Sequence, residues 1–220
     1  MNMKKKLVAG GLVAALAATA IGGATLAYFT DDDSATNNFT VGNVTIDLTE
    51  PKWDETGKVE AEDAYPGEAL AKDPTVENTG ANPAFVAVKV DWPVVDGIDT
   101  AVSTRYQYVD GYNTTDWTKV KDVIDENNKK VVSSIYLYNA YLDTGATTAP
   151  VFDQIVVSKD FTNENAGGEA GHNVVVTAYA LQAQGIVGPS WSNVTDGIDA
   201  TEQATILNTM SSEFEWGLTF

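Results

Sequence analysis

The stretch Phe85-Val86-Ala87-Val88-Lys89-Val90-Asp91-Trp92 indicates how this chain folds. Its even-numbered positions are all large and apolar, whereas two of the odd-numbered ones, Lys89 and Asp91, are charged. Alternation with a period of two places the apolar side chains on one face of a β-strand and the polar ones on the other. The stretch therefore predicts a strand that buries one face in a core.

Further short runs rich in Val, Tyr, Phe, Trp and Thr follow the same pattern and are separated by turn-forming residues. This spacing predicts a β-sandwich rather than alternating strands and helices. The run 173–181 is apolar or small on both faces, which predicts a central strand. The predicted strands are 73–78, 85–92, 106–109, 131–138, 152–157, 173–182 and 214–220.

Helical patterns are few. Asp199 is followed by Glu202 and by apolar residues at helical spacing up to Met210, which predicts a helix with a capping box. A shorter helix is expected within 115–126. The sequence Asp-Gly-Ile-Asp occurs at 96–99 and again at 196–199. We interpret both copies as a glycine turn followed by an Asp cap, and the alternative is that their carboxylates bind calcium.

The first 27 residues are typical of an export signal. Three lysines at 4–6 precede an uncharged apolar run, and the small residues Thr25 and Ala27 suit a cleavage site between Ala27 and Tyr28. The alternative is an uncleaved anchor, because about 20 apolar residues can span a bilayer. The many Gly and Ala residues favour the signal. No later stretch approaches this length, so no permanent membrane span is expected and the protein is expected to be secreted.

The composition argues against several classes of function. The chain has 13 basic and 31 acidic residues, a net charge of −18, which disfavours nucleic acid as a partner. It has no Cys and one His, His172, whereas a zinc peptidase motif needs two imidazoles one helical turn apart. No catalytic residue, metal ligand or cofactor is therefore predicted. Acidic runs such as 31–33 and 60–63 leave calcium as a possible ligand.

The first strand must change its inward face near Gly42. Apolar residues are odd-numbered before it, at Phe39 and Val41, and even-numbered after it, at positions 44, 46 and 48. A β-bulge at Gly42 explains the change. Alternatively, Gly42 is a hinge at which residues 28–41 leave their own domain and add a strand to a neighbour. The anchoring side chains would then be Tyr28, Phe29, Phe39 and Val41.

Several segments resemble the TasA/camelysin-type exported proteins: 4–11, 22–31, 38–44, 65–68, 72–80, 83–86 and, more loosely, 174–183. The resemblance implies a SipW-type signal peptidase as a partner and a jelly-roll-like β-sandwich. It also implies self-association into fibres of a biofilm matrix around a Gram-positive-type cell. In fibre-forming relatives the N-terminal segment completes a sheet of the next subunit. Camelysin-type relatives are classed as metallopeptidases.

The sequence thus predicts an all-β, jelly-roll-like β-sandwich at 42–220 with one or two short peripheral helices. It is preceded by a possible donor strand at 28–41 and a cleavable apolar signal helix at 1–27. The predicted function is a non-enzymatic structural subunit of an extracellular fibre, located in the matrix or at the cell surface. The alternative is a secreted metallopeptidase or a monomeric surface binding module. A matrix polysaccharide is a possible ligand, with Trp53, Trp117 and Trp191 as candidate contacts.

Overall fold

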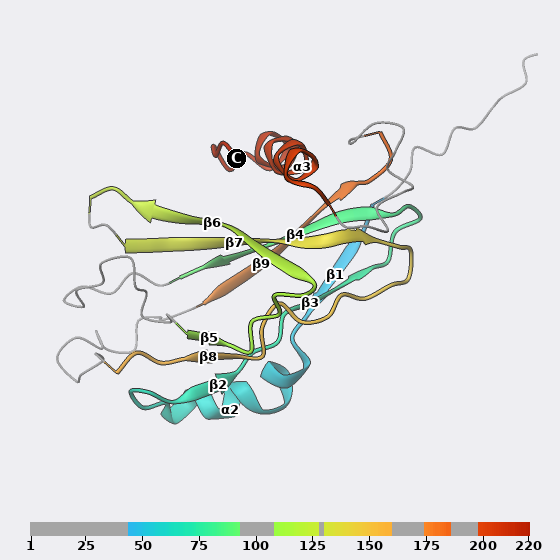
Figure 1. Ribbon diagram of the computed structural model, residues 1–220. Coiled ribbons are helices and arrows are strands. Elements are labelled where there is room, and N and C mark those ends of the chain that lie inside the picture. Colours follow the sequence, from blue (N-terminus) through green and yellow to red (C-terminus); the bar gives the residue numbers. More distant parts are fainter. Residues whose placement is uncertain (1–43, 93–107, 128–129, 160–173, 186–197) are drawn as a thin grey trace, which may run out of the picture. The chain divides into compact units, whose positions relative to one another are not determined.

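A computed structural model describes residues 44–92, 108–127, 130–159, 174–185 and 198–220 (Figure 1). The predicted signal peptide with its cleavage point at Ala27 and Tyr28, the donor segment 28–41 and the hinge Gly42 lie outside these residues. His172 and Trp191 also lie outside them. In the described ranges, no helix combines the length and the apolar character needed to cross a membrane.

The described strands form three antiparallel sheets. A four-stranded sheet has the order β6-β7-β4-β9, a three-stranded sheet the order β2-β8-β5, and β1 pairs with β3. The strands are β1 (Ile46–Thr49), β2 (Ala69–Ala71), β3 (Thr75–Asn78), β4 (Ala84–Asp91), β5 (Tyr108–Asp110), β6 (Trp117–Asp125), β7 (Lys130–Leu142), β8 (Gln154–Val156) and β9 (Val175–Gln182).

The main core lies between the four-stranded sheet and the two smaller sheets. The even-numbered side chains of β4 are fully buried there, as the alternation predicts, and Trp92 follows on the same face. On the opposite side, Leu70, Val76 and Ile155 come from β2, β3 and β8. Ile46 and Leu48 of β1 pack against the same cluster, while Asp47 and Thr49 are exposed. The even-numbered inward face expected for this strand is therefore confirmed.

The outer face of the four-stranded sheet is covered by the helix α3 (Ala200–Glu213), which lies over the sheet in Figure 1. Ile206, Leu207 and Met210 pack against Phe85 and other residues of the sheet in a second cluster, here called the outer core. Asp199 caps the helix in the predicted capping box. An all-β sandwich with short peripheral helices is thus confirmed.

Two predicted elements are wrong. The expected helix within 115–126 is instead the strand β6, which pairs along its length with β7. The expected strand 214–220 is an irregular C-terminal segment, because Glu215 (φ 54°) and Gly217 (φ 66°) adopt left-handed backbone conformations that an extended strand excludes.

The prediction that 173–181 is a central strand is also wrong for the described sheet, since β9 lies at its end. The apolar pattern on both faces has another cause. Val176 and Ala178 face the main core, whereas Leu181 packs against the outer core. The strand is covered above and below, and among the described residues no other strand pairs with it on the side away from β4.

An irregular helix after β1 is not predicted by the sequence. It comprises a π-helical turn at Trp53–Gly57, α2 (Lys58–Glu60) and a 3-10 turn at Ala61–Asp63. The backbone packs closely here, because a Cβ added at Gly57 would lie 2.2 Å from the carbonyl oxygen of Ala71. Only glycine fits this position without a shift of the neighbouring backbone.

The outer core provides a test of the helix packing. Met210→Ala removes a side chain that is completely buried, so we expect the free energy of unfolding to fall by about 3 kcal/mol. Ser212→Ala, an exposed position on the same helix, serves as the control and should change stability by less than about 0.5 kcal/mol. Denaturant unfolding measures both, and equal effects would show that α3 does not pack as described.

Candidate functional site

The two outermost strands of the four-stranded sheet, β9 and β6, differ in the residues that they carry. Within the described residues, β9 pairs on one side only, with β4, from Val175 opposite Asp91 to Gln182 opposite Ala84. All eight residues of β9 are uncharged, and none is fully buried. Edge strands of monomeric proteins usually carry charges, prolines or bulges that prevent pairing with another chain. The strand β9 carries none of these features along its paired length.

The strand at the opposite edge of the sheet, β6, has features that hinder pairing with another chain. The strand β6 contains the charged residues Lys119, Lys121, Asp122 and Asp125. Its pairing with β7 shifts register twice, between Lys119 and Lys121 and again between Val123 and Ile124. Charges and irregular register both hinder the addition of another strand. The sheet therefore has one edge suited to strand addition and one edge that is not.

The start of the described chain lies close to the open edge. The strand β1, which begins at Ile46, approaches β9. The segment that the sequence predicts as a donor strand, 28–41, ends a few residues before β1 in the chain. This proximity positions the open edge as a candidate site for that segment.

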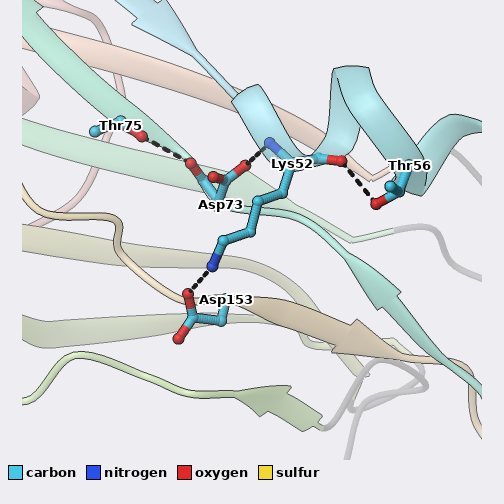
Figure 2. Close-up of polar contacts among 5 residues, drawn as sticks. All are labelled: Lys52, Thr56, Asp73, Thr75 and Asp153. Atoms are coloured by element: carbon cyan, nitrogen blue, oxygen red, sulfur yellow. Dashed lines mark hydrogen bonds and ion pairs between the residues drawn. The ribbon is translucent and has the colours of Figure 1, made fainter.

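A network of polar contacts joins three distant parts of the chain beside the irregular helix (Figure 2). The backbone N–H of Lys52 donates to Asp73 Oδ1 at 2.8 Å, and Lys52 Nζ donates to Asp153 Oδ1 at 2.6 Å. Thr75 Oγ1 and Thr56 Oγ1 donate to the carbonyls of Asp73 and Lys52. The hydrogen bond to Asp153 raises the pKa of Lys52 above its ordinary value. The network fixes the start of the helix against β2, β3 and β8.

A second ion pair in this region is buried. Lys72 Nζ lies 2.8 Å from Glu50 Oε2, and the two side chains are 4% and 18% exposed. The same ammonium group lies 4.5 Å from the centre of the Trp53 ring, within range of a cation–π interaction. Glu50 Oε1 is buried without a hydrogen-bond partner in the described part of the chain. The lysine is thus neutralised by an ion pair and contacts an aromatic ring, whereas one oxygen of the carboxylate has no partner among the described residues.

The motifs behind the family resemblance hold turns of the fold. Asn78 is completely buried, and its Nδ2 donates to the carbonyls of Asn82 and Leu142 while its Oδ1 accepts from the N–H of Gly80. Gly67 has φ 91° and donates its N–H to the carbonyl of Val157. These residues act structurally rather than chemically.

The candidate carbohydrate contacts are only partly accessible. Trp117 is 1% exposed and belongs to the main core, so its prediction as an exposed sugar contact is wrong. Its indole N–H donates to the carbonyl of Ala149. Trp53 is half-buried beneath Lys72. Among the residues that the structure describes, no group of three or more His, Asp or Glu is arranged to hold a metal ion.

The buried ion pair gives a first test of this region. Glu50→Gln leaves the Lys72 ammonium buried without a compensating charge, which should lower the free energy of unfolding by about 3 kcal/mol. Asp54→Asn breaks the Lys58–Asp54 pair, whose side chains are 59% and 63% exposed, and should cost less than about 0.5 kcal/mol. Urea unfolding at neutral pH compares them, and a small loss for both would contradict the described burial.

Tyrosine burial gives a second test. Burial, and to a smaller extent the charge of Asp122, raise the pKa of Tyr136 far above its ordinary value. The pKa of Tyr136 is higher in the folded than in the unfolded protein, so folding favours its protonated form. The resulting contribution to the free energy of unfolding is complete below the unfolded pKa of about 10 and is lost as the pH rises above it. The free energy of unfolding should fall steeply above about pH 10, and Tyr136→Phe should make the fall shallower. Unfolding measured across this range checks it, and an equally steep fall in Tyr136→Phe and the unsubstituted protein would contradict the described burial of Tyr136.

Comparison with known proteins places the chain in a family. The family model of camelysin metallo-endopeptidases matches residues 2–172, more than half of the chain. No curated protein and no solved structure matches at a significant level. The match extends through the polar network and the turn motifs described above. The resemblance in the sequence is thereby confirmed, and the chain belongs to the camelysin family.

Proposed function

We propose that this protein is a secreted structural subunit of an extracellular fibre, and that one copy adds a strand to β9 of the next. The uncharged open edge of β9 is the observation that carries the proposal. An added strand gains a row of main-chain hydrogen bonds, and alternate side chains on it provide specificity. The segment 28–41, with Tyr28, Phe29, Phe39 and Val41 as anchors and Gly42 as the hinge, supplies this strand.

Export precedes assembly in this proposal. A SipW-type signal peptidase cleaves between Ala27 and Tyr28, so the three lysines at 4–6 are removed. The exported chain then has 10 basic and 31 acidic residues, a net charge of −21. Repulsion of this size opposes association, and salt screens it. Assembly should therefore become faster as the ionic strength rises, with calcium acting as an efficient screening ion.

The family name points to a second function, proteolysis. Camelysins are named metallo-endopeptidases, and the described residues hold no metal-binding group. The open edge supports the structural role in preference to hydrolysis. Cleavage of casein by the purified exported chain, lost with a chelator and restored by zinc, would support the peptidase instead.

Deletion of the donor segment tests the strand-addition step. The exported chain should form filaments visible by negative-stain electron microscopy, whereas a variant lacking residues 28–38 should elute as a monomer in size-exclusion chromatography. The backbone that would pair with β9 is largely absent from this variant, while the sandwich itself is intact. Unchanged filaments would reject the proposal.

Charge on the acceptor edge tests the site. Val175→Lys places an ammonium group on β9 at a position that is 50% exposed and lies opposite Asp91, and we expect it to abolish filaments without changing the monomer's melting temperature by more than a few degrees. Ile124→Lys places the same charge on β6 at a position that is 39% exposed. This control should leave assembly unchanged. If both variants assemble equally well, β9 is not the acceptor.

A further inference from the structure

The C-terminal segment (214–220) brings two aromatic residues against the open strand. The ring of Tyr179 on β9 lies 4.9 Å, centre to centre, from the rings of both Phe214 and Trp216. The Phe214 and Trp216 rings are 6.2 Å apart. We call these three residues the rim cluster. Its geometry explains why an alternating apolar sequence does not form a strand here, since the left-handed residues turn the two aromatic side chains toward β9.

The segment is held firmly along its length. Ser211 Oγ donates to the carbonyl of Leu218 and accepts from its N–H, and Asn208 makes the same pair of bonds with Phe220. Lys121 Nζ donates to the carbonyl of Thr219 at 2.6 Å. Because Lys121 belongs to β6, the segment reaches from one edge strand of the sheet to the other. The rim cluster is therefore a fixed part of the fold.

The rim cluster is incompletely covered. Phe214 is 36% exposed, and Val175, on the same face of β9 as Tyr179, is 50% exposed. The indole N–H of Trp216 is buried without a hydrogen-bond partner among the described residues. Exposed aromatic surface favours an apolar side chain, and an unpaired N–H favours a carbonyl oxygen. An extended peptide with an apolar residue provides both groups.

We propose that the rim cluster recognises Phe39 from a second copy of this chain, an inference that rests on the proposed strand addition. A residue placed directly opposite Tyr179 on an added strand would have its Cβ about 4.5–5.5 Å from that of Tyr179. Phe39 in that register brings its ring against Phe214 and Trp216. Val41, two residues on, then falls on the same face of the sheet.

The negative charges near the rim cluster favour the uncharged part of the donor segment. Glu213 and Glu215 are exposed beside the rim cluster and repel carboxylates. Residues 34–41 contain no charge, whereas Asp31 to Asp33 are acidic. With Phe39 at the cluster, Asp33 lies about 20 Å away along an extended strand, beyond a Debye length at physiological salt. Phe39 is thus the aromatic anchor that suits this surface, and Phe29, two residues from Asp31, is not.

The experiment compares four forms of the exported chain: unsubstituted, Phe214→Ala, Phe39→Ala and the double variant. Each single substitution should raise the concentration at which filaments appear by about tenfold, because it removes both ring contacts and buried apolar area. The double variant should assemble about as poorly as either single variant, since both remove the same contact. Val59→Ala, which truncates a side chain that is 69% exposed on the irregular helix, is the control and should assemble normally.

The outcomes separate the two proposals. Melting temperatures confirm that each variant is folded, and Trp216→Phe, which keeps an aromatic ring but removes the N–H, should have a smaller effect than Phe214→Ala. Independent, additive effects of Phe214→Ala and Phe39→Ala would overturn the recognition of Phe39 by the rim cluster. Normal assembly of both variants, with filaments still lost on deletion of residues 28–38, would overturn it and leave strand addition intact. Absence of filaments from the unsubstituted chain would overturn both.

Discussion

Burial of β4 on both faces is the constraint on which the rest of this structure depends. Its even-numbered side chains enter the main core and its odd-numbered Phe85 and Ala87 enter the outer core. A strand in this position needs a layer on each side, which the smaller sheets provide below and α3 provides above. Because β7 and β9 occupy its two sides, the edges of the sheet, as far as the structure describes the chain, belong to β6 and β9. The position of β9 at one edge follows from this pairing order.

Alternation of apolar and polar residues predicts a strand correctly when one face of that strand is buried along its whole length. The β4 pattern and the Asp199 cap with Glu202 are both local signals, and both are confirmed by the structure. The strand β6 is missed because two register shifts break its period and its edge position admits charged residues. The segment 214–220 has a strand-like pattern, but packing around Tyr179 and the turns at Glu215 and Gly217 override it.

The candidate site depends on information that no local pattern contains. The sequence indicates that β9 is apolar on both faces, and only the pairing of strands far apart in the chain shows that it is an edge. The polar network is equally nonlocal, since Lys52 contacts residues 21 and 101 positions away. The irregular helix is hard to predict because its residues are mostly exposed and a glycine interrupts it. Its position is set by close packing of Gly57 on Ala71.

The pairing of an N-terminal segment with β9 of the next copy also gives the proposed assembly a direction. A contact in which one surface of a subunit meets a different surface of the next is heterologous, and it generates an open filament unless the rotation closes a ring. The two ends of such a filament are not equivalent: one displays a bare β9, and the other displays an unpaired N-terminal segment. Each end therefore has its own rates of subunit gain and loss. Elongation, capping and attachment to a cell can then be controlled separately at the two ends.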